Sequence, residues 1–542
     1  MDDPNVGAPQ RPVIIINRRE LRDVLTDTVA AIRAANEPPS IFRVGTVLAT
    51  VQANPIDNDD QPAIEVLERP TLRKWLSEIA DFRTQSAEGD LTPTFPPQDI
   101  VNTLISQPGH DFPRLDLVVH SPVFSASGEI ITTPGYNPAN HTFYVAHEQQ
   151  EIVVPATPTN DKVVAARHLL MGDLMGDFPF VDDASRAHAL AALLQLFVRK
   201  MIDGPTPIYL VDSPTQGTGK GLLADMICLP ATSQAAPAFP EAKDDDEWRK
   251  GITAKLAEAP TAILIDNVKK PLGSAVLALV LTRRVWRDRI LGVSKNAKLP
   301  VEVLWLATGN NLRPTGDIPR RSIWIRLDAG MERPWLDRKF RHELPAWAES
   351  NRAELAQAAL VLVQNWIARG KPFGTRVLGS FESWSRVMGG ILNAADVRGF
   401  LGNLERLYDE IDEMRASWRE LVASWHAHHA TAVVGTAQLY LLARDDEGLA
   451  HVLGDGSEES RRIRLGRALG RLADQVFGGY RIRKTARRDR SGRNLFYLEP
   501  VAPEATSAAV PLEAASGNAT ASAAEASSVS IRQMRRVAKR YE

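Results

Sequence analysis

The sequence predicts a multidomain protein with an α/β core around a mainly parallel sheet, an N-terminal α+β domain, a helical region and a C-terminal winged helix. Three observations support this fold class. Short apolar runs alternate with helical segments through residues 206–334, which is typical of parallel βαβ units. A glycine-rich loop joins the first of these runs to a helix. Near the end of the chain, an arginine-rich helix precedes an arginine-rich hairpin.

Shifts in composition divide the 542 residues into an expected series of domains. A domain commonly has about 100–200 residues, so a chain of this length should hold about three of them with smaller modules between. The Ala/Ser-rich end has almost no large apolar residues and is typical of a disordered tail. The expected divisions are an N-terminal α+β domain (1–160), a helical collar (161–205), the α/β core (206–334), a helical region (335–445), the winged-helix module (446–500) and the tail (501–542).

The composition indicates a folded cytoplasmic protein. Hydrophobic residues make up 44% of the chain, enough for more than one core. Cys228 is the single cysteine, which excludes a disulfide framework and a cysteine-rich zinc site. The acidic start and the lack of a run of about 18 apolar residues lead us to expect neither a secretory signal nor a membrane span. The net charge of −2 creates no global positive field, so any basic surface for nucleic acid must be local.

The glycine-rich loop has the features of a phosphate-binding P-loop. An apolar strand at residues 208–211 runs into Gly217-Thr218-Gly219-Lys220, and a helix follows. Glycines let the backbone direct N–H groups at phosphate oxygens, the helix N-terminus adds a favourable dipole, and the lysine reaches the β and γ phosphates. The predicted cofactors are therefore ATP and Mg²⁺. The predicted nucleotide-binding residues are Gln216, Gly217, Thr218, Gly219, Lys220, Gly221 and Leu222.

Two positions depart from the usual P-loop pattern. Pro214 stands where the pattern has its first glycine, and Gly221 stands where a serine or threonine follows the lysine. Without that hydroxyl the usual protein ligand to Mg²⁺ is missing. The alternative interpretation is a surface turn before a helix, but the order of strand, loop and helix favours the nucleotide site.

Asp266 is the predicted metal-holding residue. It ends the apolar strand at residues 261–265, and in P-loop enzymes a carboxylate at this place holds Mg²⁺. The alternative is an aspartate that ends the strand and caps the next turn. Asn267 follows, where many ATPases have a glutamate that activates water, so the general base is not identified. Glu247 and Glu258 are the other candidates for the general base, although each is more ordinarily a solvated charge on a helix.

Asn310 and two arginines complete the predicted catalytic set. Asn310 follows the apolar strand at residues 303–307, where its amide can orient the attacking water beside the γ-phosphate. The alternative is simple turn chemistry, which Gly-Asn-Asn also suits. Arg320 and Arg321 directly precede the last core strand, and at least one of them can reach a γ-phosphate held by a neighbouring subunit. The alternative for these two is a pair of solvated arginines.

The order of these motifs resembles a known family. Gly-Thr-Gly-Lys, Leu-Ile-Asp-Asn, Ala-Thr-Gly-Asn-Asn and Gly-Asp-x-x-Arg-Arg follow one another as in the AAA+-type helicase module of phage and mobile-element primase–helicase proteins, which are related to superfamily 3 helicases. The resemblance covers roughly residues 115–500. It implies a homo-oligomeric ring, often a hexamer, around single-stranded DNA, with nucleotide between subunits, so that Arg320 or Arg321 would act in trans.

The resemblance also implies a pore hairpin just before the Asn310 strand. Its strand at residues 290–294 would lead to a turn in which Lys295 and Lys298 meet DNA phosphates. On the residues alone, two lysines at a polar turn are more often merely solvated. The first 115 residues show no acidic cluster typical of a polymerase site, so a primer would have to come from a separate primase.

The arginine-rich end is the second predicted DNA-binding part. Residues 461–500 hold twelve Arg or Lys against three acidic residues. A helix at 462–477 should turn Ile463, Leu465, Leu469, Leu472 and Val476 inward, with a hairpin of residues 480–484 and 494–498 as the wing. Helix plus wing is the form of a winged helix that binds duplex DNA, and the alternative is a solvated basic face. The predicted contacts are Arg467, Arg471, Arg483, Arg487 and Arg488.

The leading hypothesis is an ATP-dependent, ring-forming DNA helicase of a phage or mobile element that acts in replication. A second hypothesis is an ATP-binding replication initiator or regulatory switch with little unwinding activity, which Gly221 and Asn267 motivate. A third, weaker one is a P-loop component of antiphage defence.

Overall fold

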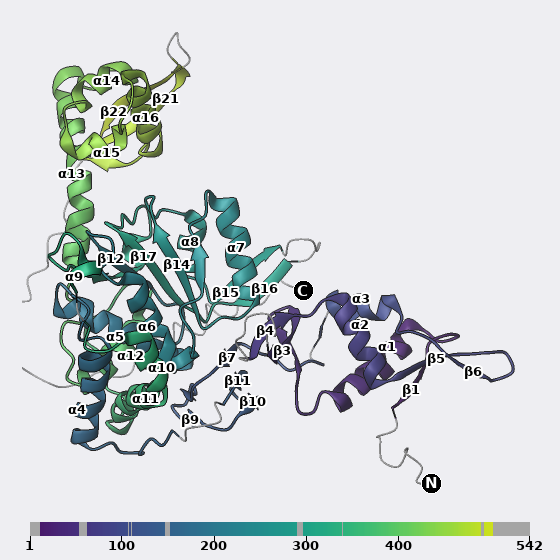
Figure 1. Ribbon diagram of the computed structural model, residues 1–542. Helices are drawn as coiled ribbons and strands as arrows, with labels where there is room; N and C mark the ends of the chain where they lie inside the picture. Colours follow the sequence, from purple (N-terminus) through teal and green to yellow (C-terminus); the bar gives the residue numbers. More distant parts are fainter. Residues whose placement is uncertain are drawn as a thin grey trace, which may run out of the picture. The chain divides into compact units, whose positions relative to one another are not determined.

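The computed structural model describes residues 11–53, 62–106, 108–109, 111–146, 152–289, 296–338, 340–488 and 493–501 (Figure 1). The chain forms two compact units, Met1–Glu413 and Met414–Glu542. The predicted tail from residue 502 onward and Lys295 lie outside the described residues. No described helix combines the length and the apolar character that crossing a membrane requires.

The N-terminal part of the first unit is a mixed helix–strand structure. Three helices pack on a three-stranded sheet and enclose a core that includes Ile14, Leu72 and Phe112. A second three-stranded sheet is antiparallel. The elements are β1 (Val13–Ile15), α1 (Leu21–Ala35), β2 (Ile41–Val44), β3 (Val47–Ala53), β4 (Pro62–Val66), α2 (Arg69–Ile79), β5 (Asp81–Gln85), β6 (Leu91–Pro93) and α3 (Gln98–Ser106).

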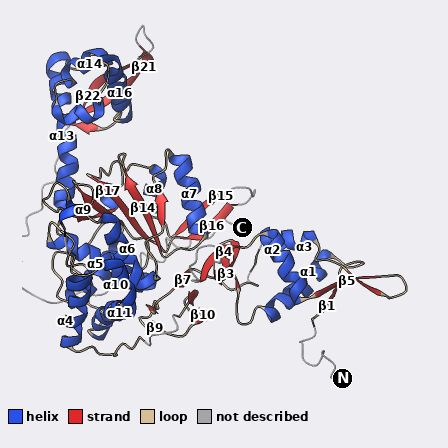
Figure 2. Cartoon of the chain, viewed as in Figure 1, coloured by secondary structure: helices blue, strands red, loops and turns tan. Residues whose placement is uncertain are grey.

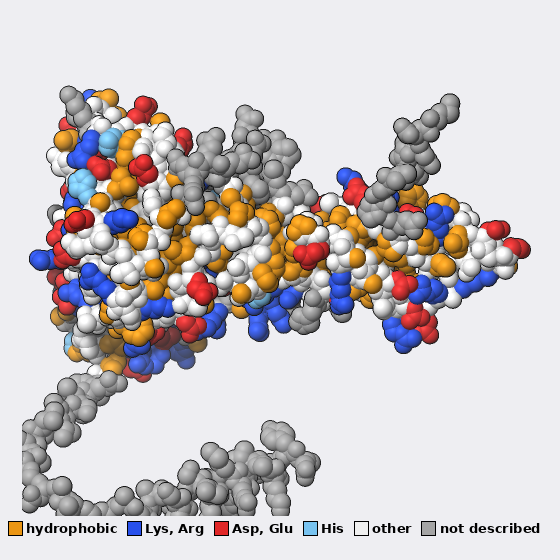
Figure 3. All heavy atoms as spheres, turned by 90° about the horizontal axis from the view of Figure 1, so that it is seen from below, with side chains coloured by type: hydrophobic (Ala, Val, Ile, Leu, Met, Phe, Trp, Pro, Cys, Tyr) orange, Lys and Arg blue, Asp and Glu red, His pale blue; other side chains and the backbone are white. Residues whose placement is uncertain are grey.

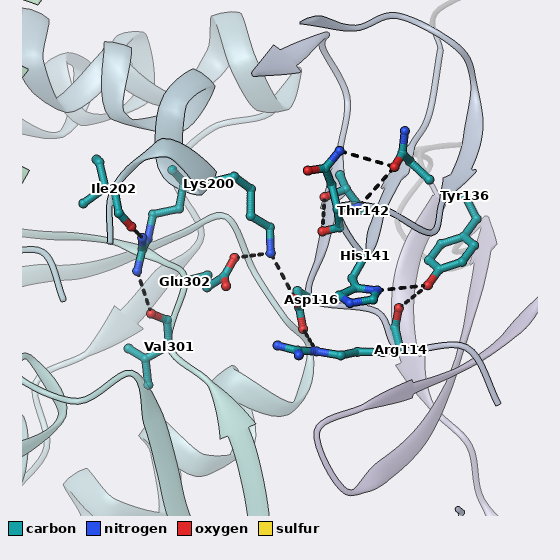
Figure 4. A network of polar contacts seen from close by, with 12 residues as sticks. Arg114, Asp116, Tyr136, His141, Thr142, Lys200, Ile202, Val301 and Glu302 are labelled. Atoms are coloured by element: carbon teal, nitrogen blue, oxygen red, sulfur yellow. Dashed lines mark hydrogen bonds and ion pairs between the residues drawn. The ribbon is translucent and has the colours of Figure 1, made fainter. Parts of the chain in front are cut away.

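A segment of short strands follows, comprising β7 (Leu117–Val119), β8 (Val123–Phe124), β9 (Ile130–Ile131), β10 (Gly135–Asn137) and β11 (Thr142–Tyr144). Buried charges join this segment to the core sheet (Figure 4). Lys200 Nζ lies 3.0 Å from Asp116 Oδ2 and 2.6 Å from Glu302 Oε2, and Arg114 Nε donates to Asp116 Oδ1 at 2.8 Å. Because a buried carboxylate is costly without partners, the two cations stabilise Asp116 in place.

The core of the first unit is a five-stranded parallel sheet in the order β13-β14-β17-β12-β18. Figure 2 shows strands β14 and β17 of this sheet in red. Its alternate residues face opposite ways: Tyr209 and Val211 enter one hydrophobic cluster, while Ile208 and Leu210 enter the other. Strand β17 lies between β12, which leads to the P-loop, and β14, which carries Asp266. The strands are β12 (Ile208–Ser213), β13 (Ala238–Pro240), β14 (Ala262–Val268), β17 (Leu304–Asn310) and β18 (Ser322–Arg326).

The expected collar and helical region share one core with this sheet. α5 is buried along nearly its whole length, as expected for a helix with apolar residues all round. It packs in the same cluster as α6, α10, α11, α12 and one face of the sheet, while α7 and α8 belong to the cluster of the other face. The helices are α4 (Asn160–His168), α5 (Asp183–Val198), α6 (Lys220–Thr232), α7 (Asp245–Ala257), α8 (Ala275–Val280), α9 (Pro334–Asp337), α10 (Leu344–Ser350), α11 (Arg352–Ala368) and α12 (Glu382–Ala394).

A buried histidine joins α5 to two other parts of this core. His188 Nε2 accepts a hydrogen bond from the backbone N–H of Leu401 at 2.9 Å, so Nδ1 carries the proton and donates to the carbonyl of Trp324 at 2.8 Å. Both nitrogens are occupied in the neutral form. Burial therefore lowers the pKa of His188 from 6.5 to about 4.

This pKa predicts a loss of stability in mild acid. As the pH falls below 6.5, the unfolded chain takes up the His188 proton before the folded protein does, so the stabilising contribution is complete above pH 6.5 and is lost towards pH 4. The expected loss is about 3 kcal/mol. Urea unfolding at pH 7 and pH 5 should show about 2 kcal/mol of this loss, because pH 5 still lies above the folded pKa of about 4. His188→Gln keeps a donor and an acceptor but does not titrate, so its midpoint should fall less, and equal falls would contradict the assignment.

The second unit begins within α13 (Leu404–His429), not at residue 446. The reason is its core, in which Trp418, Trp425 and Leu439 pack with Leu465 and Phe496. An antiparallel sheet in the order β19-β22-β21-β20 closes it. The other elements are β19 (Val434–Gly435), α14 (Thr436–Ala443), α15 (Ala450–Leu453), α16 (Glu458–Arg471), β20 (Val476–Phe477), β21 (Tyr480–Arg488) and β22 (Asn494–Pro500).

The arginine-rich helix is shorter than predicted. α16 ends at Arg471, and Asp474 has a positive φ of 72° that breaks the helix before β20. Leu465 and Leu469 are buried as expected, but Ile463 is 43% and Val476 is 44% exposed. The expected hairpin is present as β21 and β22. The winged-helix identity of this unit stays a prediction.

Charge is mixed on the face of the molecule in Figure 3, where basic, acidic and apolar side chains are interspersed. This agrees with the net charge of −2. Binding of a polyanion therefore depends on local clusters of basic side chains.

Candidate nucleotide-binding site

The predicted P-loop joins the end of β12 to the start of α6. Gly217 has φ 71° and Gly219, the N-cap of α6, has φ 92°, both in the left-handed region that favours glycine. A Cβ at position 217 would also lie 2.6 Å from Cε3 of Trp335. The loop therefore needs both glycines, and it ends on the N–H groups of a helix N-terminus, which favours an anion.

Lys220 extends from this helix start to the tip of the neighbouring strand. Its Nζ donates to Asn310 Oδ1 at 2.6 Å, to the carbonyl of Thr215 at 3.2 Å and to Thr218 Oγ1 at 3.2 Å. Burial lowers the pKa of Lys220, while Asp212 and Asp266 act in the opposite direction. Two predicted catalytic residues, 90 positions apart in sequence, thus lie in direct contact.

Asp266 lies at the adjacent strand end, held by a threonine. Thr308 Oγ1 donates to Asp266 Oδ1 at 2.5 Å and accepts from the backbone N–H of Asn267 at 2.9 Å. Thr308 pairs with Val211 in the sheet register, so the residue that holds Asp266 lies on the strand directly beside the P-loop strand. In the sequence, Thr308 is only one member of the Ala-Thr-Gly-Asn-Asn motif, and no pattern indicated its contact with Asp266.

The carboxylates here suit a magnesium ion. Asp266 is exposed, and Asp225 on α6 lies close enough to feel its charge. Burial raises the pKa of Asp225, and Asp266 raises it further, so a bound cation would relieve their repulsion. The described residues contain no group of three or more His, Cys, Asp or Glu able to hold a metal. Mg²⁺ would accordingly need phosphate oxygens and water as further ligands.

Open space surrounds Gly221, where the usual pattern has a hydroxyl. A Cβ built there would meet no heavy atom within 4 Å. Position 221 therefore has room for the side chain of a serine or threonine, and steric crowding does not explain the glycine there.

A buried ion pair supports the base of the P-loop. Asp212 is fully buried; its Oδ1 accepts from the backbone N–H of Leu312 at 2.8 Å, and its Oδ2 pairs with Nη1 of Arg326. The guanidinium carbon of Arg326 lies 5.1 Å from the ring centroid of Trp324. These contacts join β12, β18 and the turn after β17 at the carboxyl edge of the sheet.

The strap, a short segment after the last core strand that contains Trp335 and Arg338, packs on the P-loop. No pattern in the sequence indicated this contact. Arg338 donates from Nη1 to the carbonyl of Thr218 and from Nη2 to that of Asp177, each at 2.6 Å. Its guanidinium carbon lies 4.7 Å from the ring centroid of Phe340. Together with Trp335 against Gly217, these contacts hold the strap on the P-loop.

The two predicted finger arginines differ in their surroundings. Both lie in a short 3₁₀ helix, Pro319–Arg321, before β18. The Arg321 side chain is 12% exposed, pairs with Asp317 at 2.8 Å and donates to the carbonyl of Ala278. The Arg320 side chain is 61% exposed, and among the described residues it pairs with Asp317 alone, at 2.9 Å. Arg321 therefore stabilises the local fold, and Arg320 is the one that can reach outward.

Lys298 lies in a strand and not in a turn. β15 (Val285–Arg289) and β16 (Asn296–Pro300) form an antiparallel hairpin in which Lys298 stands opposite Arg287. The backbone N–H of Lys298 donates to Thr46 Oγ1 at 3.0 Å, while its side chain is exposed. Placement at the hairpin tip was thus wrong for Lys298, because the strand includes it.

The two glutamates considered as general bases form ion pairs with lysines on the surface of the protein. Glu247 pairs with Lys250 at 2.8 Å and Glu258 with Lys255 at 3.1 Å, all on or beside α7. Within the described part of the chain, neither glutamate forms a hydrogen bond or an ion pair with Lys220, Asp266 or Asn310. The general base stays unidentified.

The predicted DNA-binding arginines of the second unit are not equivalent. Arg483 pairs with Glu499 at 2.8 Å and with Asp474, so its charge is largely neutralised within the fold. This argues against a primary role of Arg483 in binding phosphates. The remaining predicted side chains are exposed: Arg467, Arg471, Arg487 and Arg488.

Comparison with known proteins gives only distant likenesses. No protein-family model and no curated protein matches the chain. An apo A-form structure of the NrS-1 C-terminal region is 11% identical, with 86% of this chain and 99% of that one covered and a TM-score of 0.35. A second apo A-form structure of that region is 10% identical, with 88% and 100% covered and a TM-score of 0.34.

The third solved structure is a JCV helicase with a bound small molecule. It is 11% identical, with 49% of this chain and 64% of that chain covered and a TM-score of 0.23. With such low identities and TM-scores, none of these likenesses identifies what this chain does.

Proposed function

We propose that this chain is an ATP-driven DNA helicase that acts in replication of a phage or mobile element and assembles as a ring. The observation that carries the proposal is the meeting of Lys220, Asn310 and the Asp266–Thr308 pair at the carboxyl edge of one parallel sheet, beside a helix N-terminus. Ligands of open α/β sheets bind at this edge, and these are the groups that phosphoryl transfer needs.

Each residue has a definite task in the proposed site. The loop N–H groups and Lys220 bind the phosphates, and Asn310 orients the attacking water. Asp266, with Asp225 beside it, would hold Mg²⁺, which when bound neutralises charge on the phosphates. Arg320, exposed before β18, would stabilise transition-state charge at the site of a neighbouring subunit.

DNA is the proposed partner of two basic elements. In the first unit, Arg287 and the exposed Lys298 share the β15–β16 hairpin, which would face single-stranded DNA. In the second unit, the exposed arginines of α16 and β21 would contact duplex phosphates. A separate primase would supply the primer.

The test is ATP hydrolysis by the purified protein with and without single-stranded DNA. We expect turnover that rises with DNA and is lost in Lys220→Ala, because the ammonium group that contacts the phosphates is gone. A forked-duplex assay then measures strand separation. Negligible wild-type turnover despite nucleotide binding would reject the helicase.

That negative result would favour a replication initiator or regulatory switch that binds ATP without rapid hydrolysis. Gly221 and Asn267 support this second candidate, because they omit the usual metal-binding hydroxyl and the usual base.

A further inference from the structure

A groove of about 420 Å³ lies in the N-terminal part of the first unit, and none of the residues assigned to the nucleotide site lines it. It is formed by α2, from Arg69 to Ser77, and by residues 95–98, which lead from β6 into the start of α3. Its lining combines three cations, one aromatic ring and two small hydrogen-bonding groups: Arg69, Arg73, Lys74, Phe95, Ser77 and Gln98.

The aromatic ring of the groove faces solvent. Phe95 is 76% exposed, so it contributes little to the core of this part. Pro96 and Pro97 follow it and restrict the backbone, and Arg73 Nε donates to the carbonyl of Pro96 at 3.0 Å. The guanidinium carbon of Arg73 lies 5.7 Å from the centroid of the Phe95 ring. The ring is thus presented in a set position beside a cation.

Two of the three cations of the groove, Arg69 and Arg73, lie on one face of α2. Arg69, Arg73 and Ser77 are four residues apart along α2, so they recur about every 6 Å on one side. No acidic residue is among those that line the groove. Lys74 has an ion pair with Glu78 at 3.7 Å, in which both side chains are more than half exposed, so the pair neutralises it weakly.

We propose that this groove binds single-stranded nucleic acid, with one base stacked on Phe95 and neighbouring phosphates on Arg69, Arg73 and Lys74. An aromatic platform beside a row of cations is how proteins bind single strands without reading their sequence. A duplex keeps its bases stacked inside and cannot use the ring. An acidic peptide would use the cations but leave Phe95 without a role. The choice of partner rests on the proposed function, but the groove uses none of the ATPase residues.

The test is binding of the full chain, without nucleotide, to a labelled oligothymidine of about 20 nucleotides, longer than common single-strand sites. Phe95→Leu should weaken binding about tenfold, because leucine cannot stack, and Phe95→Trp should restore it. Arg69→Ala/Arg73→Ala should lower the salt dependence of binding by about 1.4 in log–log slope. The matched control Arg11→Ala/Arg22→Ala also removes two exposed charges and should leave the slope unchanged.

A direct readout separates this groove from other DNA-binding parts. Oligonucleotides with 5-iodouracil should crosslink to Phe95, as identified by mass spectrometry, and the duplex form should not. Wild-type affinity in Phe95→Leu, crosslinks only elsewhere, or equal competition by polyglutamate would overturn the inference. If DNA still stimulated hydrolysis in those cases, the proposed function would stand, whereas no DNA binding or stimulation in the wild type would reject both.

Discussion

An equal mixture of the Lys220→Ala and Arg320→Ala variants is expected to hydrolyse ATP, although each variant alone is inactive. In the proposed ring, one site takes Lys220 from one subunit and Arg320 from its neighbour. Loss of a finger arginine costs about 10³–10⁵ in kcat. In mixed rings an Arg320→Ala subunit supplies an intact Lys220, and a Lys220→Ala neighbour supplies an intact Arg320. About a quarter of the interfaces should then have both an intact Lys220 and an intact Arg320, because each position of the ring takes either variant with equal chance.

The control for this experiment uses two residues from the same half of the site. Lys220 and Asp266 both belong to the sheet edge of one subunit, so mixing Lys220→Ala with Asp266→Ala should restore nothing. Hydrolysis is measured after denaturing and reassembling each mixture. Full activity of Arg320→Ala alone, or no recovery in its mixture, would show that Arg320 does not act across an interface.

Asp212→Leu is expected to lower the free energy of unfolding of the first unit by about 3–5 kcal/mol, because it leaves the Arg326 guanidinium without its buried partner. It also leaves the Leu312 N–H without its acceptor. The double variant Asp212→Leu/Arg326→Met removes both charges and should regain much of this loss. Urea unfolding followed by tryptophan fluorescence measures the change.

The exposed pair of Arg22 with Glu20 serves as the comparison for Asp212. Both of its side chains are largely solvent-exposed, so Glu20→Ala should leave the urea midpoint unchanged. A midpoint for Asp212→Leu that equals the wild type would mean that Arg326 finds water or another partner. The pair would then not stabilise the base of the P-loop.

The core strands could be predicted because burial on both faces leaves a plain signal, a continuous apolar run between turns. Ile208–Ser213 and Ala262–Val268 are found this way, and their polar last residues mark the site. Strand β13 has only three residues, too few for a pattern, and was missed. The arginine-rich helix was extended too far because its apolar spacing continues past Arg471, although Asp474 adopts a turn conformation.

The unpredicted contacts depend on the order of strands and on packing between distant segments. Lys220 meets Asn310 only because β17 lies directly beside β12. Arg338 reaches the P-loop from 120 residues away through the backbone carbonyl of Thr218, an acceptor that every residue type carries. The shared core of the collar and helical region arises in the same way, since apolar helices do not encode which neighbour they cover.

A bound phosphate would compete with acceptors of the protein itself for the N–H groups of Lys220. An ammonium group has three N–H donors, and Asn310, Thr215 and Thr218 accept from all of them. A phosphate oxygen that accepts from Lys220 must therefore displace one of these partners. If it displaces Asn310, the amide at the tip of β17 is released, two residues from the threonine that holds Asp266. Phosphate binding at the loop and release of the strand tip would then result from the same exchange of hydrogen bonds at Lys220.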